Sequence, residues 1–155
     1  MVNQNVGLSG KYLTFILGDE GYGIPVMKVK EIIRLKDTTA IPKMPNHVLG
    51  VINLRGKIVP VFDLRIKFGI PSPENSERTC VIVTQVLDGE TGERKMVGLV
   101  VDSVEEVILI QQEQIAPAPD FGQNINTEYI LGIGKVGERV RMLVDIDRII
   151  GDEDN

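Results

Sequence analysis

The chain of 155 residues contains an internal repeat, which restricts the possible folds more than any other feature of the sequence. Residues 23–33 align without a gap on residues 98–108, with five identical positions. Two further pairs of segments recur in the same order, 50–52 with 132–134 and 62–66 with 144–148. Chance similarity between strand-rich segments is the alternative explanation, but recurrence in a fixed order favours a duplicated unit.

The repeated units have the patterns of β-strands. Residues 79–87 and 95–101 are apolar runs that flank a polar loop containing glycine, which predicts a β-hairpin. Pro60 cannot donate a backbone hydrogen bond, so it predicts that its strand lies at a sheet edge. Helical signals are confined to 63–69 and 145–151, which each start with a capping Asp and include a Gly near or at the end. We therefore predict an all-β protein with short helices.

The repeat predicts two β lobes related by pseudo-twofold duplication. The first lobe covers about 11–70, a linker follows at about 71–77, and the second lobe covers about 78–150. A unit of that size buries too little surface to be stable alone, so we expect the lobes to share a hydrophobic core. Residues 1–155 then form a single domain, and exchange of strands between the lobes stays open.

Composition and charge argue against several classes of protein. The net charge is −5, and no basic stripe is present that would suit nucleic acid. The N-terminus lacks the features of a signal peptide. No apolar run approaches the roughly 20 residues that span a bilayer. We expect a cytoplasmic protein that neither binds nucleic acid nor inserts into a membrane.

No constellation of residues indicates catalysis. Residues 132–137 match the dinucleotide pattern G-x-G-x-x-G, but a strand pattern follows where that site needs a helix, so we predict a glycine-rich turn. Cys80 and His47 are the only residues of their kinds and cannot form a structural zinc site. We expect a buried, inert Cys80 and an ordinary loop His47. The prediction is a non-enzyme without cofactor, although a carboxylate pair from distant positions stays open.

The repeat contains the pattern Val-x-Glu-x-Ile at residues 29–33 and again at 104–108. In an extended chain, alternate residues lie on one side, so the aliphatic residues and the glutamate would share a face. One interpretation places the aliphatic residues in the core and the glutamate in solvent. The other is an apolar surface rimmed by charge, which is typical of a protein-docking site.

Residues 49–68 form the sharpest motif, with a strand, a turn at 53–56, a second strand and a short helix. Gly56 can adopt the positive φ that such a turn needs, and Asn53 can hydrogen-bond back to the turn. Arg55 is then either a solvated cation or a bidentate clamp on a carboxylate of the other lobe or of a partner.

Residues 50–65 read G-V-I-N-L-R-G-x-I-V-P-V-x-D-L-R, and here the sequence resembles the CheW family of chemotaxis coupling proteins. The likeness extends from about Lys11 to Ile150. It implies two five-stranded SH3-like barrels around a shared apolar core. It also implies an adaptor that couples the histidine kinase CheA, through its regulatory C-terminal domain, to the cytoplasmic tip helices of methyl-accepting chemoreceptors. The isolated protein would be a monomer.

The resemblance further implies a receptor groove between the lobes and separate surfaces for the kinase. Carried over by position, the partner-binding residues are Val29, Glu31, Gly50, Asn53, Arg55, Gly56, Gly98, Val101, Val104 and Val107. The second lobe's turn at 135–138 lacks the Asn-x-Arg-Gly pattern, so we do not expect the lobes to be interchangeable. Two alternatives are another CheA-like regulatory or scaffold domain of two-component signalling and a small-molecule-binding β-barrel.

Overall fold

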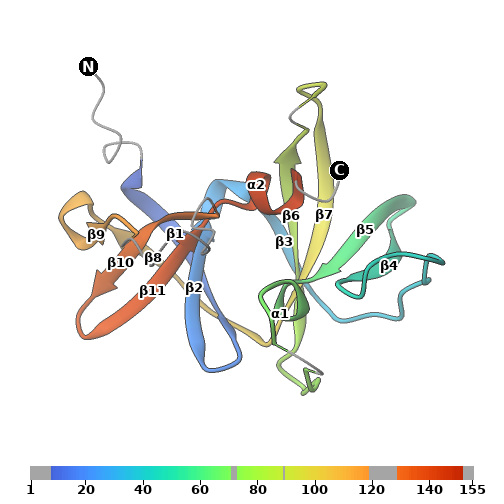
Figure 1. Ribbon diagram of the computed structural model, residues 1–155, viewed down its shortest axis with the longest axis horizontal. Coiled ribbons are helices and arrows are strands. Elements are labelled where there is room, and N and C mark those ends of the chain that lie inside the picture. The colour runs from blue at the N-terminus through green and yellow to red at the C-terminus, as the bar shows by residue number, and fades with distance from the viewer. Residues whose placement is uncertain (1–7, 71–72, 89, 119–128, 152–155) are drawn as a thin grey trace.

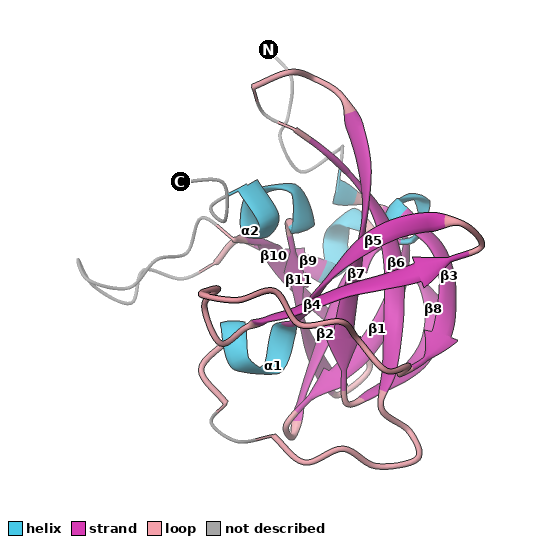
Figure 2. Ribbon diagram, turned by 90° about the vertical axis from the view of Figure 1, so that its right-hand side faces the viewer, coloured by secondary structure: helices cyan, strands magenta, loops and turns pink. Residues whose placement is uncertain are grey.

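The computed structural model describes residues 8–70, 73–88, 90–118 and 129–151. Strands make up most of this part of the chain, and the helices are short (Figure 2). The strands are β1 (Gly10–Leu17), β2 (Glu20–Pro25), β3 (Val29–Arg34), β4 (Val48–Leu54), β5 (Lys57–Asp63), β6 (Cys80–Leu87), β7 (Arg94–Val101), β8 (Ser103–Ile110), β9 (Ile115–Ala116), β10 (Ile130–Val136) and β11 (Arg139–Val144). The helices are α1 (Leu64–Lys67) and α2 (Ile146–Gly151), with 3-10 turns η2 (Val26–Lys28) and η3 (Gln112–Gln114).

The strands form two sheets that lie beside each other, with α1 and α2 near their junction (Figure 1). One sheet has six strands in the order β8-β1-β2-β11-β10-β9, and the other has five in the order β3-β6-β7-β5-β4. We call them, with the helices that follow β11 and β5, the six-stranded lobe and the five-stranded lobe. Neighbouring strands are antiparallel except for the parallel pairs β2–β11 and β5–β7.

The repeat in the sequence is a repeat in the structure. Replacing β3, β6, β7, β5 and β4 by β8, β1, β2, β11 and β10 turns one strand order into the other, parallel pair included. The predicted all-β fold of two pseudo-equivalent lobes is therefore confirmed. One sheet has six strands where five were expected, because β9 pairs with β10. In the five-stranded lobe the matching place holds a single bridge between Thr39 and Val51.

Each lobe takes strands from both halves of the chain. The chain passes from the six-stranded to the five-stranded lobe through η2, between β2 and β3. It returns at Asp102, between β7 and β8. The aligned segments 23–33 and 98–108 each span one of these crossovers, so the duplicated unit is itself divided between the lobes.

A shared core holds the lobes together, as predicted. Its buried side chains come from β1, β2 and β11 of one lobe, from β5, β6 and β7 of the other, and from both helices. Each lobe also has a smaller cluster of its own. Strand β6 is apolar on nearly every residue because Ile82 faces the shared core while Val81 and Val83 face the lobe's own cluster. A strand buried on both faces loses the alternation of a half-exposed one.

The structure confirms some of the local features predicted from the sequence and contradicts others. The hairpin of β6 and β7 and the Asp63 cap of α1 are confirmed, the latter by a 2.9 Å hydrogen bond from the Arg65 N–H. The glycine-rich turn predicted at 132–137 is mostly strand, because residues 132–136 lie in β10 and only Gly137 lies in the turn, while the strand expected after it is β11. The edge position predicted from Pro60 is wrong, because β5 lies between β7 and β4. Its pairing with β7 covers only residues 61–63, so Pro60 lies outside that ladder.

Candidate functional site

The turn between β4 and β5 has the geometry of a two-residue hairpin. Arg55 and Gly56 have φ values of 51° and 88°, and type I′ turns need positive φ at both central residues. The side-chain Oδ1 of Asn53 accepts a 2.8 Å hydrogen bond from the Gly56 N–H. The predicted backbone roles of Asn53 and Gly56 are confirmed. A left-handed backbone is unfavourable for a residue with a Cβ, so Arg55 is an outlier that suggests a use for its side chain.

Arg55 forms an ion pair that closes the five-stranded lobe. Its Nη2 donates a hydrogen bond to Oε1 of Glu31, which raises the pKa of the guanidinium above its usual value. Glu31 lies on β3 at one end of the sheet, and the turn belongs to the hairpin at the other end. The carboxylate therefore comes from the same lobe, not from the other lobe that the sequence suggested. The Arg55 side chain stays 72% exposed.

The six-stranded lobe has a matching closure that the sequence reasoning missed. Glu105 of edge strand β8 pairs with Arg139 at 2.8 Å and lies 3.7 Å from the Nε of Arg141. Arg139 is the first residue of β11, directly after the second hairpin turn. The turn at 135–138 ends one position before this arginine, so the turn residues alone do not reveal the pair.

A shift of register in both edge strands decides which residues face the gap between the lobes. Residues directly opposite in an antiparallel pair share a face. On β8, Val104 lies opposite Phe15 and Val107 opposite Leu13, and both partners belong to the shared core. The extra residue between them, as in a β-bulge, keeps Val104 and Val107 on one face.

The same shift occurs in β3. Val29 lies opposite Thr84 and Ile32 opposite Ile82, on the face toward the shared core. The expected grouping of Val29 with Glu31 is therefore wrong, because Glu31 lies opposite Val83 of the lobe's own cluster. Ile32, which is 44% exposed, is a further residue that the alternation concealed. We call Val29, Ile32, Val104 and Val107 the inter-lobe quartet.

A hollow of about 690 Å³ lies between the lobes next to β8. Ile16, Cys80 and Val104 are its half-buried apolar residues, and burial raises the pKa of the Cys80 thiol, so the thiol stays protonated at neutral pH. Its lining is completed by Arg78, Ser103, Glu105 and Glu106. Apolar residues set below charged ones are the composition of a protein-docking surface.

The turn borders a second hollow of about 410 Å³. Its lining includes Glu31 and Arg55, together with Lys30, Leu54, Lys57 and Met96. The predicted site residues are thus divided between two places: Glu31 and Arg55 lie at the mouth of the five-stranded lobe, and Val104 lies in the hollow between the lobes.

Three of the predicted site residues lie beneath the surface. Val101 is fully buried in the shared core. A Cβ on Gly50 would lie 2.0 Å from the carbonyl oxygen of Thr39. A Cβ on Gly98 would lie 2.8 Å from Cγ1 of Val81. Substitution at these positions would act on a partner only by moving the strands.

Within residues 8–70, 73–88, 90–118 and 129–151, no three His, Cys, Asp or Glu side chains are grouped to hold a metal ion. Over the same residues, no helix is long and apolar enough to cross a membrane.

Comparison with known proteins places the fold in a family. Residues 11–154 match the CheW-like domain. Chemotaxis protein CheW of Klebsiella aerogenes is 44% identical over 144 residues, covering 93% of this chain and 83% of that protein. Chemotaxis protein CheW of Helicobacter pylori is 35% identical, covering 90% and 81%. The crystal structure of the scaffolding protein TtCheW from Thermoanaerobacter tengcongensis aligns with a TM-score of 0.79 at 33% identity, covering 94% and 97%. This chain belongs to the CheW family.

Proposed function

We propose that this CheW-family chain is a chemotaxis adaptor that acts in the cytoplasm by binding alone. It binds the cytoplasmic tip helices of a methyl-accepting chemoreceptor between its lobes, and the regulatory C-terminal domain of the kinase CheA through another surface. It would thereby hold the two partners in a fixed relation, so that small movements of the receptor helices bias the activity of the kinase. The observation that carries the proposal is the hollow of about 690 Å³ between the lobes, which has Val104 of the inter-lobe quartet on its lining.

The hollow between the lobes suits one face of a helix. An α-helix with its side chains is about 10–12 Å across and offers an apolar stripe to a partner groove. Val104 and Val107 supply apolar surface along β8, and Val107 is 49% exposed. Arg78 and Glu106, on the lining of the hollow, can set the register of the helix by charge.

The test is a titration of the chain with a receptor-tip fragment and, separately, with the regulatory domain of CheA. Val107→Asp should weaken binding of the receptor fragment by about tenfold or more, because it places a charge in an apolar contact. Binding of the kinase domain should stay unchanged, since the proposal assigns it to another surface.

Val140→Asp is the matched control. Val140 is also an exposed valine of the six-stranded lobe, but it lies at the start of β11 and outside the quartet. If the two substitutions weakened receptor binding equally, the assignment of the receptor to the hollow between the lobes would be contradicted. A wild-type chain that binds neither partner, yet is stabilised against heat by a small metabolite, would support the small-molecule-binding alternative instead.

A further inference from the structure

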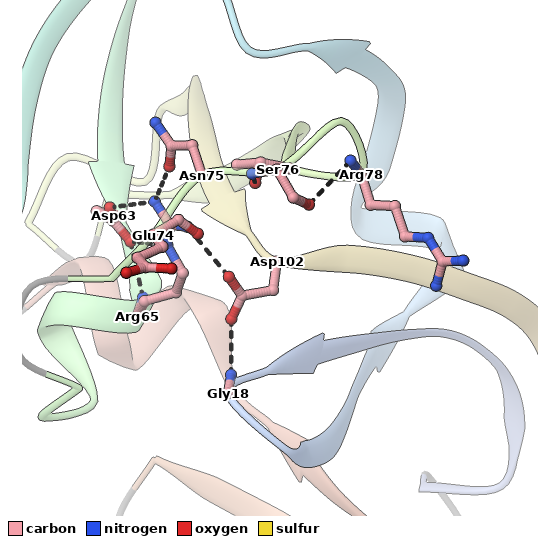
Figure 3. A network of polar contacts seen from close by, with 9 residues as sticks. Gly18, Asp63, Arg65, Glu74, Asn75, Ser76, Arg78 and Asp102 are labelled. Atoms are coloured by element: carbon pink, nitrogen blue, oxygen red, sulfur yellow. Dashed lines mark hydrogen bonds and ion pairs between the residues drawn. The ribbon is translucent and has the colours of Figure 1, made fainter.

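Two ionic links join the lobes at pseudo-equivalent places. The first is centred on Asp102, at the crossover from β7 to β8 (Figure 3). Its Oδ1 accepts a 3.1 Å hydrogen bond from Nη1 of Arg65 on α1. Its Oδ2 accepts a 2.7 Å hydrogen bond from the N–H of Gly18, at the end of β1. One carboxylate therefore ties the helix of the five-stranded lobe to a strand end of the six-stranded lobe.

The first link has a buried cation and a partly exposed carboxylate, since the Asp102 side chain is 26% exposed. The Arg65 side chain is only 3% exposed and also pairs with Asp63 at 2.9 Å. Its Nη2 donates to Oδ1 of Asn75 at 2.8 Å, and its Nη1 donates to the carbonyl oxygen of Glu74 at 3.3 Å. Arg65 thus fixes β5, the crossover and the segment before β6 at one point.

The second link is centred on Asp147 of α2. Its Oδ2 lies 2.6 Å from Nζ of Lys28, at the crossover from β2 to β3. Its Oδ1 accepts a 3.0 Å hydrogen bond from the N–H of Leu87, at the end of β6. This carboxylate therefore ties the helix of the six-stranded lobe to a strand end of the five-stranded lobe.

The two links have the same arrangement of groups with the positions of the charges exchanged. In each, a carboxylate bridges a cation and a backbone N–H. The first link joins α1, a crossover and the end of β1, and the second joins α2, the other crossover and the end of β6, which is the strand equivalent to β1. The carboxylate belongs to the crossover in the first link and to the helix in the second. The Lys28 and Asp147 side chains are 27% and 29% exposed, so both charged groups of the second link reach solvent, whereas the Arg65 guanidinium of the first link does not.

Each crossover leads directly into a strand that carries two residues of the inter-lobe quartet. Lys28 precedes Val29, and Asp102 comes two residues before Val104. We propose that Lys28 and Asp147 are positioning residues for β3, as Arg65 and Asp102 are for β8. They hold the two halves of the inter-lobe quartet at the spacing that docking requires, without touching the partner. This inference rests on the proposed adaptor function.

The test removes the second link. Lys28→Met should shift or broaden the distance between spin labels at Lys57→Cys and Lys135→Cys, which lie on the five-stranded and six-stranded lobes. The distances are measured in a Cys80→Ala background without partner. With native Cys80, the same variant should bind the receptor-tip fragment about three- to tenfold more weakly. Its unfolding midpoint should change little, because a single ion pair whose two charges reach solvent contributes little stability.

Two variants serve as controls. Arg148→Met removes a cation from α2 whose partner, Asp145, lies at the start of the same helix, so it should leave the distance and the affinity as in wild type. Lys28→Arg keeps the charge and should restore both. If Lys28→Met leaves the distance distribution as in wild type, the positioning role is overturned, whatever the partner does. If the wild-type chain does not bind the receptor fragment, the proposed function fails, while the distance measurement still decides whether the link positions β3.

Discussion

The two lobes are each closed by a glutamate–arginine pair, but they build it from different parts of the hairpin. In the five-stranded lobe, Glu31 meets Arg55, which occupies a left-handed position in the turn itself. In the six-stranded lobe, Glu105 meets Arg139 and Arg141, which lie on β11. Closing a lobe therefore does not require an arginine in the turn.

The two closures differ in the exposure of their arginines. The Arg55 side chain is 72% exposed, whereas the six-stranded lobe has one exposed arginine, Arg139 at 56%, and one buried arginine, Arg141 at 5%. The six-stranded lobe buries a cation against its glutamate, and the five-stranded lobe presents one to solvent beside a hollow. The first arrangement contributes mainly to stability, and the second leaves a guanidinium that can bind a carboxylate of a partner. The difference separates a structural closure from one available for recognition.

The largest expected effect separates the two glutamates. Glu105→Ala should lower the free energy of unfolding by about 2 kcal/mol, because it removes the 2.8 Å pair with Arg139 and the carboxylate that lies 3.7 Å from the buried Nε of Arg141. Glu31→Ala should move the midpoint of urea unfolding much less, because Arg55 is already solvated. Urea denaturation of both variants under the same conditions measures the contrast. Equal losses of stability would show that the two closures are energetically alike.

A smaller effect should divide stability from binding at the turn. Arg55→Asn introduces Asn-Gly, the sequence that type I′ turns prefer, so the unfolding midpoint should rise slightly. The same variant should bind the partner that docks beside the turn, the receptor-tip fragment or the CheA domain, about fivefold more weakly, since it removes the exposed guanidinium. Thermal unfolding and titration on one preparation test both statements. If Arg55→Asn or Arg55→Ala unfolds the protein, Arg55 is a structural clip and its docking role is refuted.

The smallest effect concerns salt. Raising the salt concentration to about 1 M shortens the screening length to about 3 Å and weakens exposed ion pairs more than buried ones. The stability difference between wild type and Glu31→Ala should then disappear, while that between wild type and Glu105→Ala should persist. Urea titrations of the three proteins at low and high salt give the four stability differences. Loss of both differences in salt would show that Arg141 is more hydrated than its burial indicates.

Much of the fold follows from the sequence alone, because strands, turns and caps are local. The repeat predicted the equivalence of the two sheets, and the Asn53 and Gly56 positions of the turn were predicted from residue type. Spacing along the chain suffices for such features. Pro60 misled because an edge position is a property of a whole sheet, which a single residue does not report.

The docking face, in contrast, was decided by pairing between distant strands. Simple alternation separates Val104 from Val107, and only the register of β8 against β1 places them on one face. The lobe closures and the two inter-lobe links likewise join residues that are 24 to 119 positions apart in the chain. Such contacts depend on where whole strands and helices come to rest in the tertiary structure, which the local pattern of side chains does not specify.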